Sequence, residues 1–155
     1  VVSADAALRD HPDVLYAGFI QDAQKEYAEA NLTYALTRGE VIPSPHDLDV
    51  GYAAYLNGLG EAVGEIRRHV LDELRHGKIT RSEQLLQAMD DVYGILVTID
   101  YPDAMTGGLR RTTDMVRGVL EKTRGDLTLA IRQRQLEMAL HNLERKLGRD
   151  QGNQD

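Results

Sequence analysis

Apolar residues in the first third of the chain recur at alternating intervals of four and three positions. This spacing gathers side chains on one face of a helix. It predicts a helix over residues 12–38, with an apolar stripe whose tyrosines we expect in the core rather than stacked on bases. For Tyr27, which lies between two glutamates, both interpretations stay open. The stripe consists of Tyr16, Ile20, Ala23, Tyr27, Ala30 and Tyr34. Gly39 follows this helix, and the two prolines of Val41–Pro45 predict a linker.

The same alternation is clearest in the next segment, which predicts a second helix from about Asp47 to Gly77. Its apolar stripe, expected to be buried, is Tyr52, Leu56, Leu59, Val63, Ile66, Val70 and Leu74. Tyr55 also falls at helical spacing, and we expect it in the core.

A third helix is predicted over residues 82–98, with Ser82 as its N-terminal cap. We expect its buried side to be Leu85, Leu86, Met89, Val92, Tyr93 and Leu96. A turn follows at 101–108, and the helical pattern resumes over 109–147, as one long helix or as two divided near Gly118 or Gly125. No strand pattern occurs. The sequence predicts an all-α fold of long antiparallel helices.

Length and composition limit the kinds of protein that this chain can be. The 155 residues suit one domain, which we assign to 1–148, followed by a polar tail over 149–155. No apolar run is long enough to span a bilayer and no signal-peptide pattern is present, so we expect a cytoplasmic protein. The chain has no cysteine, so a metal would need oxygen or imidazole ligands. A net charge of -7 means that nucleic acid would need a locally basic surface.

Two pairs of glutamates share helix faces. Glu26 and Glu29 are three residues apart in the first helix, and Glu61 and Glu65 are four apart in the second. If the helices pack together, four carboxylates converge into a site that suits Mg2+ or Mn2+ and phosphodiester hydrolysis. The alternative is that each pair is a solvated surface, since the chain has 25 acidic residues. Small residues on the face of Glu61 and Glu65 favour close approach of a helix or ligand.

Four short segments resemble motifs of the translin/TRAX family. Tyr55–Glu65 is similar to the TRAX motif Y-L-x-G-x-x-D-L-T-G-E, and Gln24–Ala30 resembles the family's Q-E-Y-V-E-A, interrupted by Lys25. Asp47–Val50 resembles H-L-D-V, and Val92–Gly94 resembles V-Y-D-G-F with one residue missing. The resemblance covers about residues 12–125 and is to the catalytic, archaeal-type TRAX branch.

This resemblance implies a metal-dependent endoribonuclease that cleaves RNA inside a homo-oligomeric, octamer-like shell. In the family, the TRAX carboxylates of these two helices bind Mg2+ or Mn2+. Position by position, Glu26, Glu29, Glu61 and Glu65 carry over as both catalytic and metal-binding residues, with Glu61 in place of an aspartate. The family also has a helix before the one that carries Glu26, and we expect this sequence to lack it.

Arginines are the candidate RNA ligands. Arg110 and Arg111 lie where the family has a basic cluster, and Arg67 and Arg68 follow Glu65 within one helical turn. Arginines on helix surfaces also form weak ion pairs with neighbouring acids, which is the alternative interpretation. The histidines at 69, 76 and 141 are interpreted as surface residues, because only half of a di-iron motif is present.

Two other functions remain open from the residues. The chain could be a translin-like protein that binds RNA or single-stranded DNA without cutting it, although it retains all four glutamates. It could also be an all-α nucleotide pyrophosphohydrolase, whose site uses similar carboxylate pairs. That class does not account for the run Tyr55–Glu65.

Overall fold

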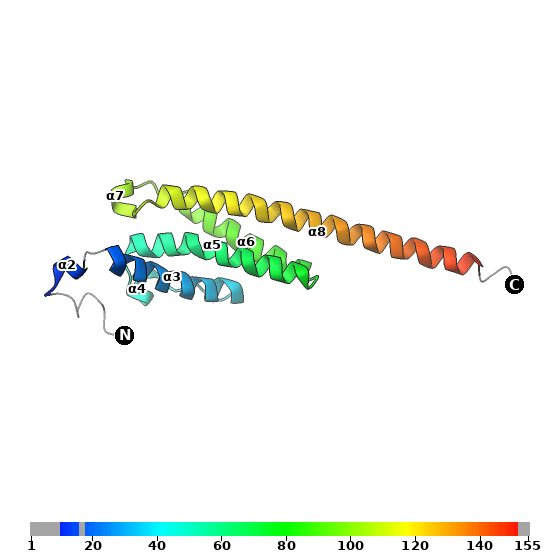
Figure 1. Ribbon diagram of the computed structural model, residues 1–155, viewed down its shortest axis with the longest axis horizontal. Helices are drawn as coiled ribbons and strands as arrows, with labels where there is room; N and C mark the ends of the chain where they lie inside the picture. The colour runs from blue at the N-terminus through cyan, green and yellow to red at the C-terminus, as the bar shows by residue number, and fades with distance from the viewer. Residues whose placement is uncertain (1–9, 16–17, 152–155) are drawn as a thin grey trace.

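The computed structural model describes residues 10–15 and 18–151, and this part of the chain is helical without any strand (Figure 1). The predicted all-α fold is confirmed. Three elements have only four residues: α2 precedes α3, and α4 and α7 lie in the connections between longer helices. The helices are α2 (Pro12–Leu15), α3 (Gly18–Arg38), α4 (Pro45–Leu48), α5 (Tyr52–Arg75), α6 (Ile79–Leu96), α7 (Asp103–Thr106) and α8 (Leu109–Gln151).

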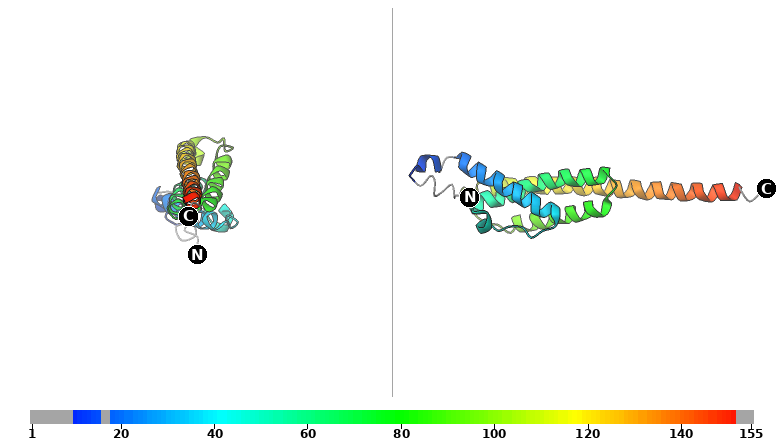
Figure 2. Two further views of the ribbon diagram at one scale, coloured as in Figure 1. Left: turned by 90° about the vertical axis from the view of Figure 1, so that its right-hand side faces the viewer. Right: turned by 90° about the horizontal axis from the view of Figure 1, so that it is seen from below.

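Helix α5 forms the centre of the bundle, with α3, α6 and the first half of α8 packed around it (Figure 2). Most of its predicted stripe is buried, as the amphipathic pattern required, although Tyr52 at its first turn is exposed. The predicted buried side of α6 is confirmed at Leu85, Met89, Val92 and Leu96. The core also includes Ala28, Leu32, Val116 and Leu120.

The directions of the helices follow from the lengths of their connections. The short turns after α5 and α6 reverse the chain, so α5, α6 and α8 alternate in direction as predicted (Figure 1). Residues 39–51 instead cross back along the bundle, and α3 therefore runs parallel to α5 rather than antiparallel. Both helices begin at the same end of the molecule, and Gly58, in the second turn of α5, lies against Lys25 and Glu29 of α3.

The crossing segment has a defined structure. The Ser44 hydroxyl and the Asp47 carboxylate form a capping box around the first turn of α4. Asp49 then takes a left-handed conformation with φ of 54°, which ends α4. The second helix therefore begins at Tyr52 rather than near Asp47. The Tyr55 hydroxyl donates a hydrogen bond to the Pro43 carbonyl at 2.8 Å and holds the segment against α5.

Two other predicted helix boundaries were wrong. Helix α6 begins at Ile79, and Ser82 lies inside its first turn, where its buried hydroxyl donates to the Lys78 carbonyl at 3.1 Å instead of capping a helix. Of the two alternatives for residues 109–147, the structure has the single long helix. This helix, α8, continues to Gln151, into the segment predicted as a tail. Residues 152–155 lie outside the described part. Packing on α5 and α6 carries the helix through Gly118 and Gly125.

The apolar stripe predicted for the first helix points away from the core, which corrects the sequence interpretation. Tyr27 and Tyr34 are 46% and 59% exposed, and the buried face of α3 is formed by Ala28, Leu32 and Ala35. Helix α3 has apolar residues on two faces, and periodicity could not show which of them packs. Tyr16, the first residue of the predicted stripe, lies outside the described residues.

Within the described ranges, no helix has the length and apolar character needed to cross a membrane.

Candidate carboxylate site

Close packing of α3 on α5 builds the site. A Cβ atom placed on Gly58 would lie 2.7 Å from the Lys25 carbonyl oxygen and 3.0 Å from the Glu29 amide nitrogen. Only glycine lets the two backbones approach this closely. The side chains that flank this contact on α3 and α5 are therefore brought together. The small residues on the face of Glu61 and Glu65 had predicted such a close approach.

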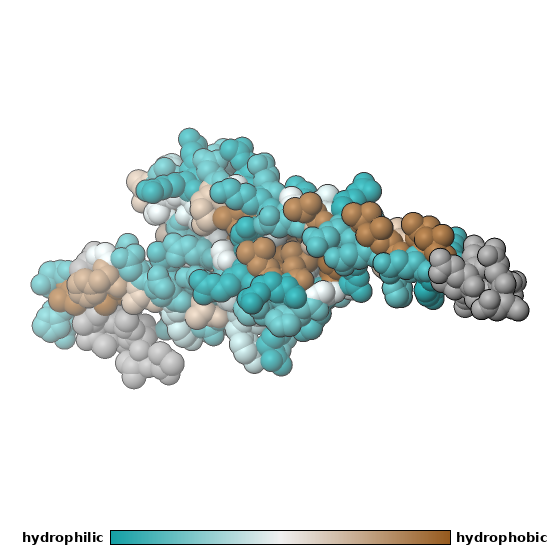
Figure 3. Space-filling view, turned by 45° about the vertical axis from the view of Figure 1, so that its right-hand side comes forward, coloured by the Kyte–Doolittle hydropathy of each residue, from teal (hydrophilic) through white to brown (hydrophobic). Residues whose placement is uncertain are grey.

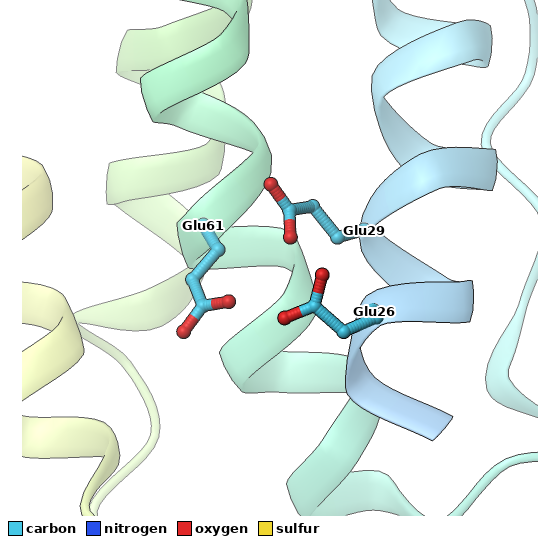
Figure 4. A group of neighbouring side chains, drawn as sticks. All are labelled: Glu26, Glu29 and Glu61. Atoms are coloured by element: carbon cyan, nitrogen blue, oxygen red, sulfur yellow. The ribbon is translucent and has the colours of Figure 1, made fainter. Parts of the chain in front are cut away.

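Glu26 and Glu29 of α3 point toward Glu61 of α5 across this contact (Figure 4). One carboxylate oxygen from each residue lies within 4.8 Å of the others. Oxygen ligands of Mg2+ lie about 2.1 Å from the ion, hence at most about 4.2 Å from one another. Rotations that move these oxygens by less than about 1 Å would therefore let them share one ion. The donor set, three hard oxygens with two of the carboxylates half-buried, fits a divalent cation.

The electrostatics of the cluster are unfavourable without a cation. Burial raises the pKa of Glu29 above its ordinary value, and repulsion from Glu61, Glu26 and Glu65 raises it further. Partial desolvation and nearby like charges both penalise the ionised form. A bound cation would remove this penalty.

Lys25 supplies one positive charge at the edge of the cluster. Its ammonium nitrogen lies 2.9 Å from Glu61 Oε1, and the two side chains are 24% and 33% exposed. This hydrogen bond raises the pKa of Lys25, so the ammonium group stays charged. Sequence reasoning noted Lys25 only as an interruption of a motif and did not assign it to the site. The sequence did place Lys25 directly before Glu26 and four residues before Glu29, on the helix face that carries the predicted site.

Glu65 lies one turn beyond Glu61 and is not among the three converging carboxylates. It is close enough to Glu29 to raise the pKa of that residue, but its own carboxylate forms an ion pair with Arg68 at 3.2 Å. The structure thus brings together three of the four predicted glutamates and places the fourth beside them.

A cavity of about 570 Å3 opens next to Glu61, between α3, α5 and the start of α8. Lys25 and Arg111 both line it, so one predicted RNA ligand lines the same cavity as Glu61. Asn57, which the sequence analysis did not assign, forms part of its wall. Its amide donates to the Ala53 and Thr106 carbonyls at 2.9 and 2.7 Å, and accepts from the Thr112 hydroxyl at 2.6 Å.

The other predicted arginines lie elsewhere. Arg110 is exposed and lines a separate hollow at the α6–α7 turn. Arg67 binds Asp126 at 2.8 Å and Thr123 at 2.9 Å, which joins α5 to α8 and favours a structural role. Arg68 is exposed apart from its pair with Glu65. The three histidines at 69, 76 and 141 are exposed, as expected.

Comparisons with known proteins place this fold and site in a family. No family model matches the chain. An uncharacterised protein of Methanocaldococcus jannaschii is 32% identical over 130 residues, 83% of this chain and 58% of that protein. The structure of AfC3PO in complex with duplex RNA is 35% identical, with a TM-score of 0.76 over 83% of this chain and 66% of that one. A second crystal structure of AfC3PO is 33% identical, with a TM-score of 0.74 over 83% and 67% of the two chains.

The chain thus spans a little over half of the Methanocaldococcus protein and about two thirds of AfC3PO. AfC3PO is an archaeal member of the translin/TRAX group, and the similarity covers 83% of this chain. The sequence identity, the shared helical fold and the motifs around Glu26 and Glu61 agree. The chain belongs to the translin/TRAX family.

Proposed function

We propose that this chain is the catalytic subunit of a divalent-metal-dependent endoribonuclease of the TRAX type. The observation that carries the proposal is the convergence of Glu26, Glu29 and Glu61 beside a cavity lined by Lys25 and Arg111. Acidic ligands for a cation and basic groups for a phosphate are thus adjacent. The related AfC3PO has been solved with duplex RNA, which supports RNA as the substrate.

Each residue has a defined part in the proposed reaction. Glu26, Glu29 and Glu61 would hold Mg2+ or Mn2+, with Glu65 as a fourth carboxylate beside Glu29. A bound divalent cation lowers the pKa of water toward neutrality and stabilises negative charge on the phosphate. Arg111, with its planar guanidinium group, would orient the phosphodiester from the α8 side of the cavity. Arg110 would contact the RNA backbone outside the cavity.

We further propose that the chain assembles with copies of itself. The second half of α8 projects beyond the bundle, and apolar patches run along it (Figures 1 and 3). Leu129, Leu136 and Leu143 recur every seven residues, and Leu140 and Leu147 follow the last two by four, which is a coiled-coil spacing. All five are more than half exposed. Sedimentation of the native chain and of a Leu136→Gln, Leu143→Gln variant tests this, because a monomeric native chain would contradict it.

The enzymatic proposal is tested by cleavage of labelled single-stranded and duplex RNA with Mg2+, Mn2+ or EDTA at low salt. We expect metal-dependent internal cleavage that falls on the order of 100-fold or more in Glu26→Ala, Glu29→Gln and Glu61→Gln. Glu65→Ala should also lose cleavage and keep its fold. Glu83→Gln, an exposed carboxylate of α6, serves as the matched control.

Three results would contradict the proposal. RNA binding without cleavage by the folded native chain would favour a binding protein. Hydrolysis of nucleoside triphosphates in place of RNA would favour a pyrophosphohydrolase. Unfolding of Glu65→Ala, measured by circular dichroism, would assign Glu65 a structural role.

A further inference from the structure

Lys25 belongs to two features at once. Its ammonium group is the counter-ion of Glu61, at 2.9 Å, and its side chain lines the cavity beside the carboxylates. A divalent cation shared by Glu26, Glu29 and Glu61 would bind the same carboxylate that Lys25 now holds. Even on different oxygens of this carboxylate the two cations would repel each other, so the lysine and the metal compete for Glu61.

The Lys25 backbone is fixed, but its side chain can move. The Lys25 carbonyl lies against Gly58, where a Cβ atom would come within 2.7 Å, so this turn of α3 cannot shift toward α5. The four-carbon side chain carries a rotatable point charge. Displacement from Glu61 would therefore move the ammonium group within the cavity and leave the helix in place.

We propose that Lys25 is a built-in counter-ion that a divalent cation displaces from Glu61, and that the displaced ammonium group then binds a phosphate group of the substrate together with Arg111. This inference rests on the proposed function, because it takes the three glutamates as the metal site. It adds a phosphate subsite that forms when the metal binds.

The charges that line the cavity support this exchange. They are Asp22, Lys25, Glu61 and Arg111. While Lys25 pairs with Glu61, the cavity holds two cations and two carboxylates and has no net attraction for an anion. Once a metal occupies Glu61, two cations face a single free carboxylate, Asp22. The cavity then attracts a phosphate, which is the group that hydrolysis requires next to the metal.

Metal and phosphate binding should consequently strengthen each other. A phosphate that holds Lys25 in the cavity removes the competitor from Glu61, so the metal binds more tightly. By reciprocity, the metal raises the affinity for phosphate by the same factor. A lysine that only stabilises the α3–α5 contact would contribute nothing to this coupling.

The test is a Mn2+ titration of the full chain followed by electron paramagnetic resonance, with and without dimethyl phosphate, a phosphodiester that resists hydrolysis. Lys25→Met retains the apolar stem and removes the charge, and Lys25→Gln is a second variant should the first fold poorly. Lys122→Met, at an exposed lysine of α8, is the matched control.

We expect Lys25→Met to bind Mn2+ roughly tenfold more tightly than the native chain, within the range typical of coupled sites. Dimethyl phosphate should tighten Mn2+ binding to the native chain and to Lys122→Met more than to Lys25→Met. Equal Mn2+ affinities of Lys25→Met and the native chain, or equal effects of dimethyl phosphate on both, would overturn the exchange while leaving the metal site intact. Absence of Mn2+ binding by the native chain would overturn the metal site itself, and with it the proposed function.

Discussion

The two helices that carry the glutamates are held in the molecule very differently. Helix α5 is covered by α3, α6 and α8, and Val63, Ile66 and Val70 are fully buried along its length. Helix α3 lies at the edge of the bundle, with Leu32 as its one large fully buried side chain among the described residues and an exposed face on the other side.

This difference indicates how the site is assembled. Glu61 projects from a helix whose position is determined by the whole core. Glu26 and Glu29 project from a helix that packs almost entirely on α5 and approaches it very closely at Gly58. The geometry of the carboxylates should therefore be more sensitive to changes at the α3–α5 contact than the overall stability is. Three variants test this contrast.

The largest effect is expected in the centre of α5. Ile66→Ala removes a fully buried side chain and should reduce the free energy of unfolding by about 2–5 kcal/mol, through lost burial and the cavity that remains. Urea denaturation followed by circular dichroism measures this change. Val41→Ala, in the exposed linker, is the control and should change stability by less than about 0.5 kcal/mol. A small effect of Ile66→Ala would show that α5 is not the centre of the core.

An intermediate effect is expected at the α3–α5 contact. Gly58→Ala forces a methyl group against the Lys25 carbonyl, and neither backbone can yield without moving a helix. We expect a loss of about 1–3 kcal/mol by urea denaturation, together with faster amide hydrogen exchange in α3 than in α5.

Gly64→Ala is the matched control for this variant. It lies in the same helix with open space around its Cβ position, so alanine should stabilise the helix by about 0.5–1 kcal/mol. Equal exchange in α3 for Gly58→Ala and the native chain would show that the contact does not position the glutamates.

The same contrast explains how much of the fold the sequence could predict. In α5 the apolar residues form a single stripe, so periodicity identified Leu59, Val63 and Ile66 as core. In α3, apolar residues occupy two faces, and the small Ala28 and Ala35 are buried while the larger tyrosines face outward. Close helix packing selects small residues, whereas a hydrophobic pattern gives more weight to large ones. Tertiary contact therefore decided which face is buried.

The site was predictable to the extent that it depends on helix spacing. Glutamates three or four residues apart share a face in any helix, so each pair could be recognised in the sequence. The convergence of Glu26 and Glu29 on Glu61 required the parallel alignment of α3 and α5, which depends on the path of residues 39–51. No periodicity encodes that path. The Lys25–Glu61 ion pair and the cavity with Arg111 could not be derived from spacing for the same reason.

The smallest effect concerns the charge on Glu29. Its folded-state pKa is raised above the ordinary value of 4.5, by burial first and then by the neighbouring carboxylates. The folded chain therefore holds this proton more tightly than the unfolded chain, and stability falls as pH rises from 4.5 through the raised pKa. In EDTA, Glu29→Gln should match the native chain at pH 4 and exceed its stability at pH 7 by up to about 1 kcal/mol, since the group is partly exposed.

Glu83→Gln on α6 is the control for this variant and shows the general effect of removing one negative charge. Added Mn2+ should reverse the order at pH 7, because the native chain gains binding energy that the variant lacks. If Glu29→Gln is no more stable than the native chain at pH 7 in EDTA, the carboxylates do not repel one another enough to need a cation.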